Sequence, residues 1–194
     1  MNCNGLRNIA LVLVSALALG ACGGGVKKSP IADNAPEWVN KGSGAMKDKD
    51  GKQVFYGVGA VQGVRNIPLA RTSADDRGRA EIAKTMNTMV TVLGKDYAAS
   101  VTAGDMTKSS EEQMISQTQK VFAKFTLHGS VPVDHWVDRS NPNSNIVYSL
   151  VKLDMASVQA SLAESKELDS KVRDYVKANA DKAFDEMAAE EAKH

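Results

Sequence analysis

Apolar positions along the chain fall into three patterns: one continuous run near the start, alternation in three short segments, and stripes at helical spacing elsewhere. The segments 53–61, 126–138 and 145–153 are rich in β-branched and aromatic residues, which predicts strands. In the first of them Gly57 and Gly59 leave one face without side chains. Such a bare face predicts that another element packs very close to it.

A helix that begins near Pro68, with Asn66 as its candidate N-cap, is expected to cover the bare face. Its apolar positions recur at spacings of three and four, small at the start of the helix and bulky later. The charged positions of the opposite face, Asp75 and Asp76 among them, are expected to be exposed. The apolar stripe consists of Ala70, Ala74, Gly78, Ile82, Met86, Met89, Val90 and Leu93.

A second helix is predicted from Ser109 or Ser110 to about Phe125. The sequence Asn-Pro-Asn-Ser-Asn at 141–145 is a strong turn signal, so the two strands that flank it should pair as an antiparallel hairpin. Asp154 then caps a helical tail that is interrupted near Ser165.

These elements predict an α+β fold: a small three-stranded antiparallel sheet with helices on one face (β-α-α-β-β), plus a C-terminal helix. The domain is expected to span residues 36–164 and the amphipathic helix residues 165–194. Closely mixed charges flank the apolar stripe of that helix, which argues against a helix lying on a membrane. The stripe is expected either to pack back on the domain or to bind a partner or a second copy. It consists of Leu168, Val172, Val176, Ala180, Ala183, Phe184 and Met187.

The continuous apolar run, residues 9–19, follows the single charge of Arg7 and leads into Leu-Gly-Ala-Cys22. Its 11 residues are too few to span a bilayer as a helix, which takes about 20. A short run followed by small residues and a cysteine is the pattern of a lipoprotein signal peptide, in which the cysteine thiol takes a diacylglycerol and the new amine takes a fatty acid such as palmitate. We therefore predict a signal peptide over 1–21, lipidation at Cys22 and a flexible tether over 22–35.

Position 23 bears on the destination of such a lipoprotein. An aspartate directly after the lipidated cysteine retains a lipoprotein at the inner membrane, and this chain has Gly23 there. The cell outer membrane is therefore the expected location. The sequence leaves open whether the domain faces the periplasm or the cell surface.

Charge and cysteine content exclude several classes of function. Loss of residues 1–21 removes one of the 24 basic residues and none of the 23 acidic ones, so the mature chain has no basic excess for a nucleic-acid partner. Cys3 leaves with the signal and Cys22 becomes a thioether. The mature chain then has no cysteine for a disulfide, a nucleophile or a metal site.

Two sequence features resemble parts of a cofactor site and of a metal site, but neither has the spacing that such a site requires. The glycines between 57 and 63 are spaced one residue wider than in the dinucleotide-binding fingerprint, and no acidic residue ends a second strand about 20 residues on. His128 and His135 are seven residues apart on one predicted strand, so their side chains should point to opposite faces and share no metal. We expect no catalytic residues, no cofactor and no metal, and no enzyme activity.

Five short motifs give the chain from about 36 to 154 a resemblance to a known family, the Lpp-twenty family of outer-membrane lipoproteins. The resemblance implies an α/β domain on a lipid tether that makes protein contacts, related in fold to envelope domains of flagellar-ring, curli-export and peptidoglycan-synthase-activator lipoproteins. It brings no catalytic residues and does not include the helix after about 165. The motifs are Pro36-Glu37-Trp38, Phe55-Tyr-Gly-Val-Gly59, Ala70-Arg71 with Ala74 and Arg77, Asp134-His-Trp136, and Val147-Tyr-Ser-Leu-Val-Lys-Leu-Asp154.

The sequence thus predicts a lipid-anchored outer-membrane lipoprotein with a non-enzymatic protein-interaction or structural role in the cell envelope. Its expected partners are the membrane, through the anchor, and envelope proteins, with self-association through the C-terminal helix as a further option. The alternative is an accessory factor that regulates an envelope machine for peptidoglycan synthesis, secretion or flagellar assembly.

Overall fold

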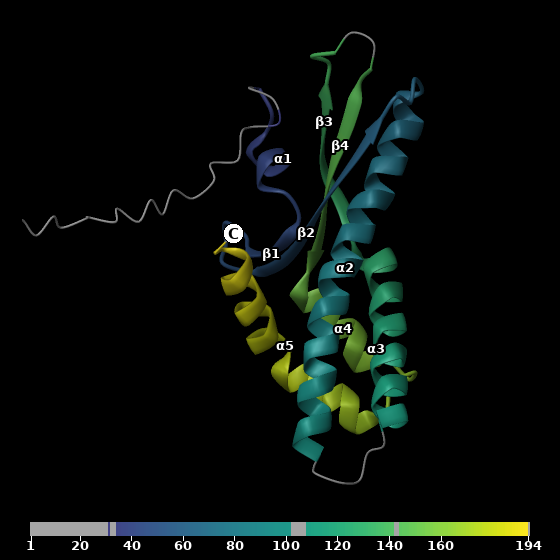
Figure 1. The fold of residues 1–194 in the computed structure, drawn as a ribbon, viewed down its shortest axis with the longest axis vertical. Coiled ribbons are helices and arrows are strands. Elements are labelled where there is room, and N and C mark those ends of the chain that lie inside the picture. Colours follow the sequence, from purple (N-terminus) through teal and green to yellow (C-terminus); the bar gives the residue numbers. More distant parts are fainter. Residues whose placement is uncertain (1–30, 32–33, 102–107, 142–143, 194) are drawn as a thin grey trace, which may run out of the picture.

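The computed structural model describes residue 31 and residues 34–101, 108–141 and 144–193. Four antiparallel strands form one sheet in the order β1-β2-β4-β3, and helices α2 to α5 gather on one side of it (Figure 1). The elements are α1 (Glu37–Lys41), β1 (Gly44–Lys47), β2 (Gln53–Gln62), α2 (Ile67–Val101), α3 (Lys108–Gly129), β3 (Val131–Asp138), β4 (Ile146–Asp154), α4 (Met155–Glu164) and α5 (Ser170–Glu191).

The glycine-bearing face of β2 lies directly against α2, as predicted. A Cβ atom at Gly57 would lie 1.9 Å from the carbonyl oxygen of Gly78, and one at Gly59 would lie 2.0 Å from that of Ala74. Real side chains do not fit at such distances, so these glycines set how closely the helix approaches the sheet. The start of α2 is also as predicted, because the Asn66 side chain accepts a hydrogen bond from the backbone N–H of Leu69 (3.2 Å).

The predicted stripe of α2 is buried, and its bulky half continues into the main core between the helices and the sheet. Phe55 of β2, Phe122 of α3 and Phe184 of α5 are fully buried there. The rings of Phe55 and Phe184 meet edge to face with their centroids 5.0 Å apart. Side chains far apart in the sequence therefore close one core.

The apolar stripe of α5 is part of that core, so the C-terminal helix packs back on the domain. Val172, Val176 and Ala180 on this stripe are all buried within the chain. At the far end of the helix, Glu191 accepts a hydrogen bond from the backbone N–H of Ala45 (2.6 Å) and so covers the outer edge of β1. Any self-association of this helix would have to use its other faces.

The predicted count of three strands is wrong, because residues 44–47 form a fourth strand. A strand of four residues containing Gly and Lys carries little propensity of its own. It forms because the turn after it brings it back onto β2: the Asp48 carboxylate accepts hydrogen bonds from the backbone N–H groups of Asp50 and Lys52, both at 2.9 Å.

The boundary between the second long helix and the strand after it was also predicted wrongly. Residues 126–129 belong to α3, and the strand begins only at Val131. Thr126 is accommodated in the helix because its hydroxyl donates to the carbonyl oxygen of Phe122 (3.0 Å), four residues earlier. The hairpin of β3 and β4 is confirmed, with a bulge between Pro132 and Asp134.

Candidate functional site

The predicted signal peptide, the lipidation site Cys22 and most of the tether lie outside the described residues. The described chain begins beside α1, where the backbone N–H of Ile31 donates to the side chain of Asn40 (2.8 Å). Within the described ranges no helix is both long and apolar enough to cross a bilayer.

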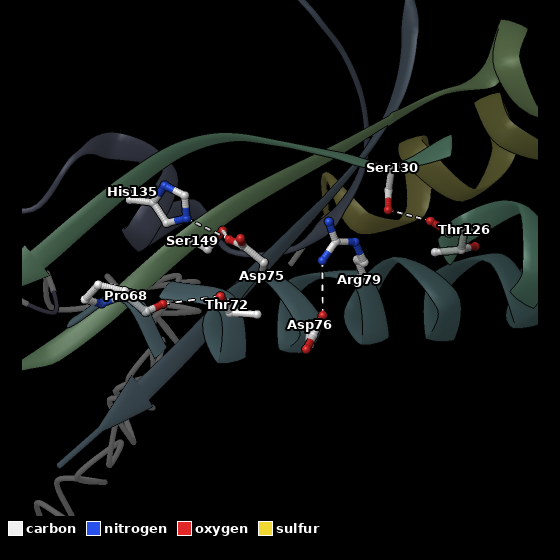
Figure 2. Close-up of polar contacts among 9 residues, drawn as sticks. All are labelled: Pro68, Thr72, Asp75, Asp76, Arg79, Thr126, Ser130, His135 and Ser149. Atoms are coloured by element: carbon white, nitrogen blue, oxygen red, sulfur yellow. Dashed lines mark hydrogen bonds and ion pairs between the residues drawn. The ribbon is translucent and has the colours of Figure 1, made fainter. Parts of the chain in front are cut away.

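The main polar cluster of the domain lies between α2 and the sheet, where Asp75 points at His135 and Ser149 (Figure 2). One carboxylate oxygen of Asp75 accepts from the Ser149 hydroxyl at 2.5 Å and lies 2.7 Å from Nε2 of His135. Ser149 is fully buried. The side chains of Asp75 and His135 are 17% and 24% exposed.

The sequence prediction that Asp75 is solvent-exposed is therefore wrong. Its position directly beside Ala74, which rests on Gly59, carries it onto the neighbouring strands. His135 and Ser149 are direct partners in the register of β3 and β4, so both reach the same face of the sheet. Asp76, one residue further along α2, does point to solvent and pairs with Arg79 at 3.1 Å.

The order of these three groups differs from that of a nucleophilic triad. In a triad the imidazole lies between the serine and the carboxylate and takes the hydroxyl proton. Here the carboxylate lies in the middle, and the Ser149 hydroxyl donates to Asp75 from a fully buried position. Charge-assisted hydrogen bonds of this kind join α2 to both β3 and β4, so the cluster acts as a structural fastening.

The glycines and the other histidine considered from the sequence for a cofactor or metal site also make contacts within the fold. Gly57 and Gly59 of β2 lie against the backbone of α2, so they serve the close packing of this helix on the strand. His128 lies on α3 rather than on the predicted strand, and its Nδ1 is 2.8 Å from the carbonyl oxygen of Lys124. Among the described residues no three His, Cys, Asp or Glu side chains come together in a way that could hold a metal ion.

The opposite face of the sheet carries α1 (Figure 1). Half-buried aromatic side chains belong to this region, namely Trp38, Tyr56 and Trp136. The Trp38 indole N–H donates to Asp134 of β3 at 2.9 Å, and the next residue of β3 is His135, which points to α2. Because neighbouring strand residues point to opposite faces, α1 and α2 lie on opposite sides of the sheet. On β3 and β4, the rings of Trp136 and Tyr148 lie with their centroids 5.4 Å apart, and burial raises the pKa of Tyr148.

A pocket of about 310 Å³ lies between α1 and the hairpin of β1 and β2 on this outer face. Its rim includes Asp48, whose pKa is held low chiefly by the backbone N–H of Lys52, with further contributions from Asp50 and Lys152. Lys152 also forms an ion pair with Asp154 at 2.9 Å, and this contact raises the lysine pKa. The pocket is lined by Glu37, Trp38, Lys41, Gly42, Met46, Lys47, Asp48, Lys49, Tyr56 and Leu150.

Sequence reasoning missed this pocket. The alternation that placed Tyr56 opposite the glycine face was visible in the sequence. The positions of α1 and β1, which supply half of the lining residues, depend on pairings that no local pattern indicates.

No protein-family model, curated protein or solved structure matches this chain.

Proposed function

We propose that this protein is a lipid-anchored lipoprotein of the outer membrane whose domain has a non-enzymatic, protein-interaction or structural role in the cell envelope. The observation that carries the proposal is the sequence Leu-Gly-Ala-Cys at 19–22 after an uncharged apolar run of 11 residues. A lipobox needs each of these features in this order, and Gly23 favours export to the outer membrane.

The arrangement of the domain supports a binding role over a catalytic one. The polar cluster around Asp75 is committed to holding α2 on the sheet. The outer face instead presents half-buried aromatic and apolar side chains around a pocket. Contacts with large, partly exposed aromatic residues are typical of protein interfaces.

The same pocket favours one version of the second candidate, an accessory factor that regulates an envelope machine. A purely structural lipoprotein needs no recessed binding surface, whereas a regulator has to recognise a particular partner. In-cell crosslinking followed by mass spectrometry separates the two, since a regulator gives adducts with a component of such a machine and a purely structural protein does not.

Replacement of the proposed lipidated residue tests the anchor directly. Cys22→Ala is expected to abolish incorporation of labelled palmitate and to move the protein from the membrane fraction to the soluble fraction, because the thioether cannot form. The matched control is Cys3→Ala, which changes a residue that leaves with the signal and should keep both label and membrane association. Palmitate label retained in Cys22→Ala would contradict the proposal.

A further inference from the structure

The outer-face pocket has an apolar floor built from four separate elements. The side chains of the floor come from α1, β1, β2 and β4, and each is only partly buried in the folded chain. Their remaining apolar surface is therefore accessible to a ligand. The floor consists of Trp38, Met46, Tyr56 and Leu150.

The aromatic wall of the pocket is held in place before any ligand arrives. The indole N–H of Trp38 is bonded to Asp134 of β3 at 2.9 Å, which fixes α1 over the sheet. Gly42 follows α1 with a φ of 81°, a conformation that favours glycine and turns the chain into β1. A wall fixed in this way costs little conformational entropy on binding.

The rim of the pocket carries three lysines and two carboxylates. Lys47 is 3.3 Å from Asp185, and Asp48 is 3.5 Å from Lys152, so these two charges already have partners. The side chains of Lys41 and Lys49 make no hydrogen bond or ion pair with any residue in the described part of the chain. Of the two rim carboxylates, Glu37 is in the same condition. The charges left over therefore favour an anionic ligand.

From the floor and the rim together we propose that this pocket binds an acidic segment of a partner protein. One large apolar side chain of the segment lies on the floor beside Trp38, and flanking carboxylates lie near Lys41 and Lys49. The volume of about 310 Å³ is near the lower end for ligand pockets and suits one or two side chains. This inference rests on the proposed protein-interaction role and specifies the surface and the chemistry of the partner.

A synthetic peptide tests the proposal without knowledge of the partner. The probe is a blocked peptide with two central leucines flanked by glutamates, added to the purified full-length chain in detergent. Because the chain contains only two tryptophans, their indole N–H resonances can be followed separately by NMR. Saturable movement of the Trp38 resonance is expected, with a smaller change at Trp136, which does not line the pocket.

Charge reversal at the rim provides the decisive comparison. Lys41→Glu with Lys49→Glu should weaken the peptide about tenfold, because two exposed charge contacts become repulsive. The control pair, Lys95→Glu with Lys177→Glu, changes two exposed lysines that do not line the pocket and should leave the affinity unchanged.

Three results would overturn the proposal: no saturable binding, equal binding of a peptide with lysines in place of the glutamates, or no effect of the rim variant. Binding to vesicles of anionic phospholipid that the rim variant abolishes, without peptide binding, would assign the pocket to a membrane surface instead. The Cys22→Ala chain should bind the peptide with the same affinity, because this substitution leaves the lining residues of the pocket unchanged. A failure of the pocket is therefore distinguishable from a failure of the lipid anchor.

Discussion

The two faces of the sheet are built on opposite principles. On the inner face, glycines bring the backbone of α2 into contact with β2, and the Asp75 cluster fastens the same helix to β3 and β4. On the outer face, larger side chains such as Tyr56 remain half-buried, and the short α1 lies beside them. A face packed this tightly can serve only the fold, whereas the looser face retains surface for another molecule.

The largest loss of stability is expected when a side chain is introduced at Gly57, on the inner face of the sheet. Gly57→Val places carbon atoms where the Gly78 carbonyl lies, so α2 must move away from the sheet, at a cost of about 3 kcal/mol in the free energy of unfolding or more. Chemical denaturation measures the change. Ala60→Val is the matched control, because the same strand presents this residue to the outer face. Its effect should stay within about 1 kcal/mol. Equal losses in the two variants would mean that the faces do not differ as described.

A smaller loss of stability is expected when the hydrogen bonds that join Asp75 of α2 to the sheet are removed. Asp75→Ala leaves the fully buried Ser149 hydroxyl without its acceptor, which typically costs about 1–3 kcal/mol. Asp76→Ala, one residue further along the helix and exposed, should change stability by no more than about 0.5 kcal/mol. A double-mutant cycle with Ser149→Ala measures the coupling. Additive losses in that cycle would show that the two side chains do not act together.

The smallest effect is expected at Glu191, which joins the end of α5 to the edge of β1. Burial raises the pKa of Glu191, so the folded chain binds its proton more tightly than the unfolded chain does. This residue therefore contributes stability at low pH that is lost as the pH rises from the unfolded value of about 4.3 through the raised folded value.

Glu191→Gln should remove that pH dependence and keep an acceptor for the N–H of Ala45. Above the pH at which Glu191 loses its proton in the folded chain, the substitution should change the free energy of unfolding by less than about 1 kcal/mol. The change is small because much of the side chain is exposed. Glu190→Gln, the exposed neighbour, is the control and should leave the pH profile of the unfolding free energy unaltered. If Glu191→Gln and the wild type had the same pH profile of the unfolding free energy, Glu191 would not be the cause of the pH dependence.

The inner face could be predicted from the sequence because its signals are local and periodic. The glycine pair of β2, the stripe that begins at Ala70 and the cap at Asn66 are each visible within a few residues. The mixed α+β class followed from these elements and from the turn at 141–145. The burial of Asp75 could not be predicted, because it depends on the rotation of α2 about its own axis as the helix lies on the sheet.

The outer face could not be predicted, because distant segments build it. β1 exists only through its pairing with β2, and the Trp38 indole finds its acceptor 96 residues away on β3. The end of α3 was misplaced for a related reason: Thr126 is β-branched and favours a strand, yet it lies buried in the last turns of the helix. At these positions, contacts between residues far apart in the sequence determined the structure more than local secondary-structure propensity did.

The central claim is that the outer face, and not the α2 face, contacts other proteins of the envelope. The most direct measurement places a photo-crosslinking amino acid in living cells at Lys41, on the rim of the pocket, and in a matched chain at Lys84, an exposed position of α2. We expect a discrete adduct with an envelope protein from position 41 that Lys49→Glu suppresses, and none from position 84. Adducts from position 84 alone, or equal adducts from both, would contradict this claim.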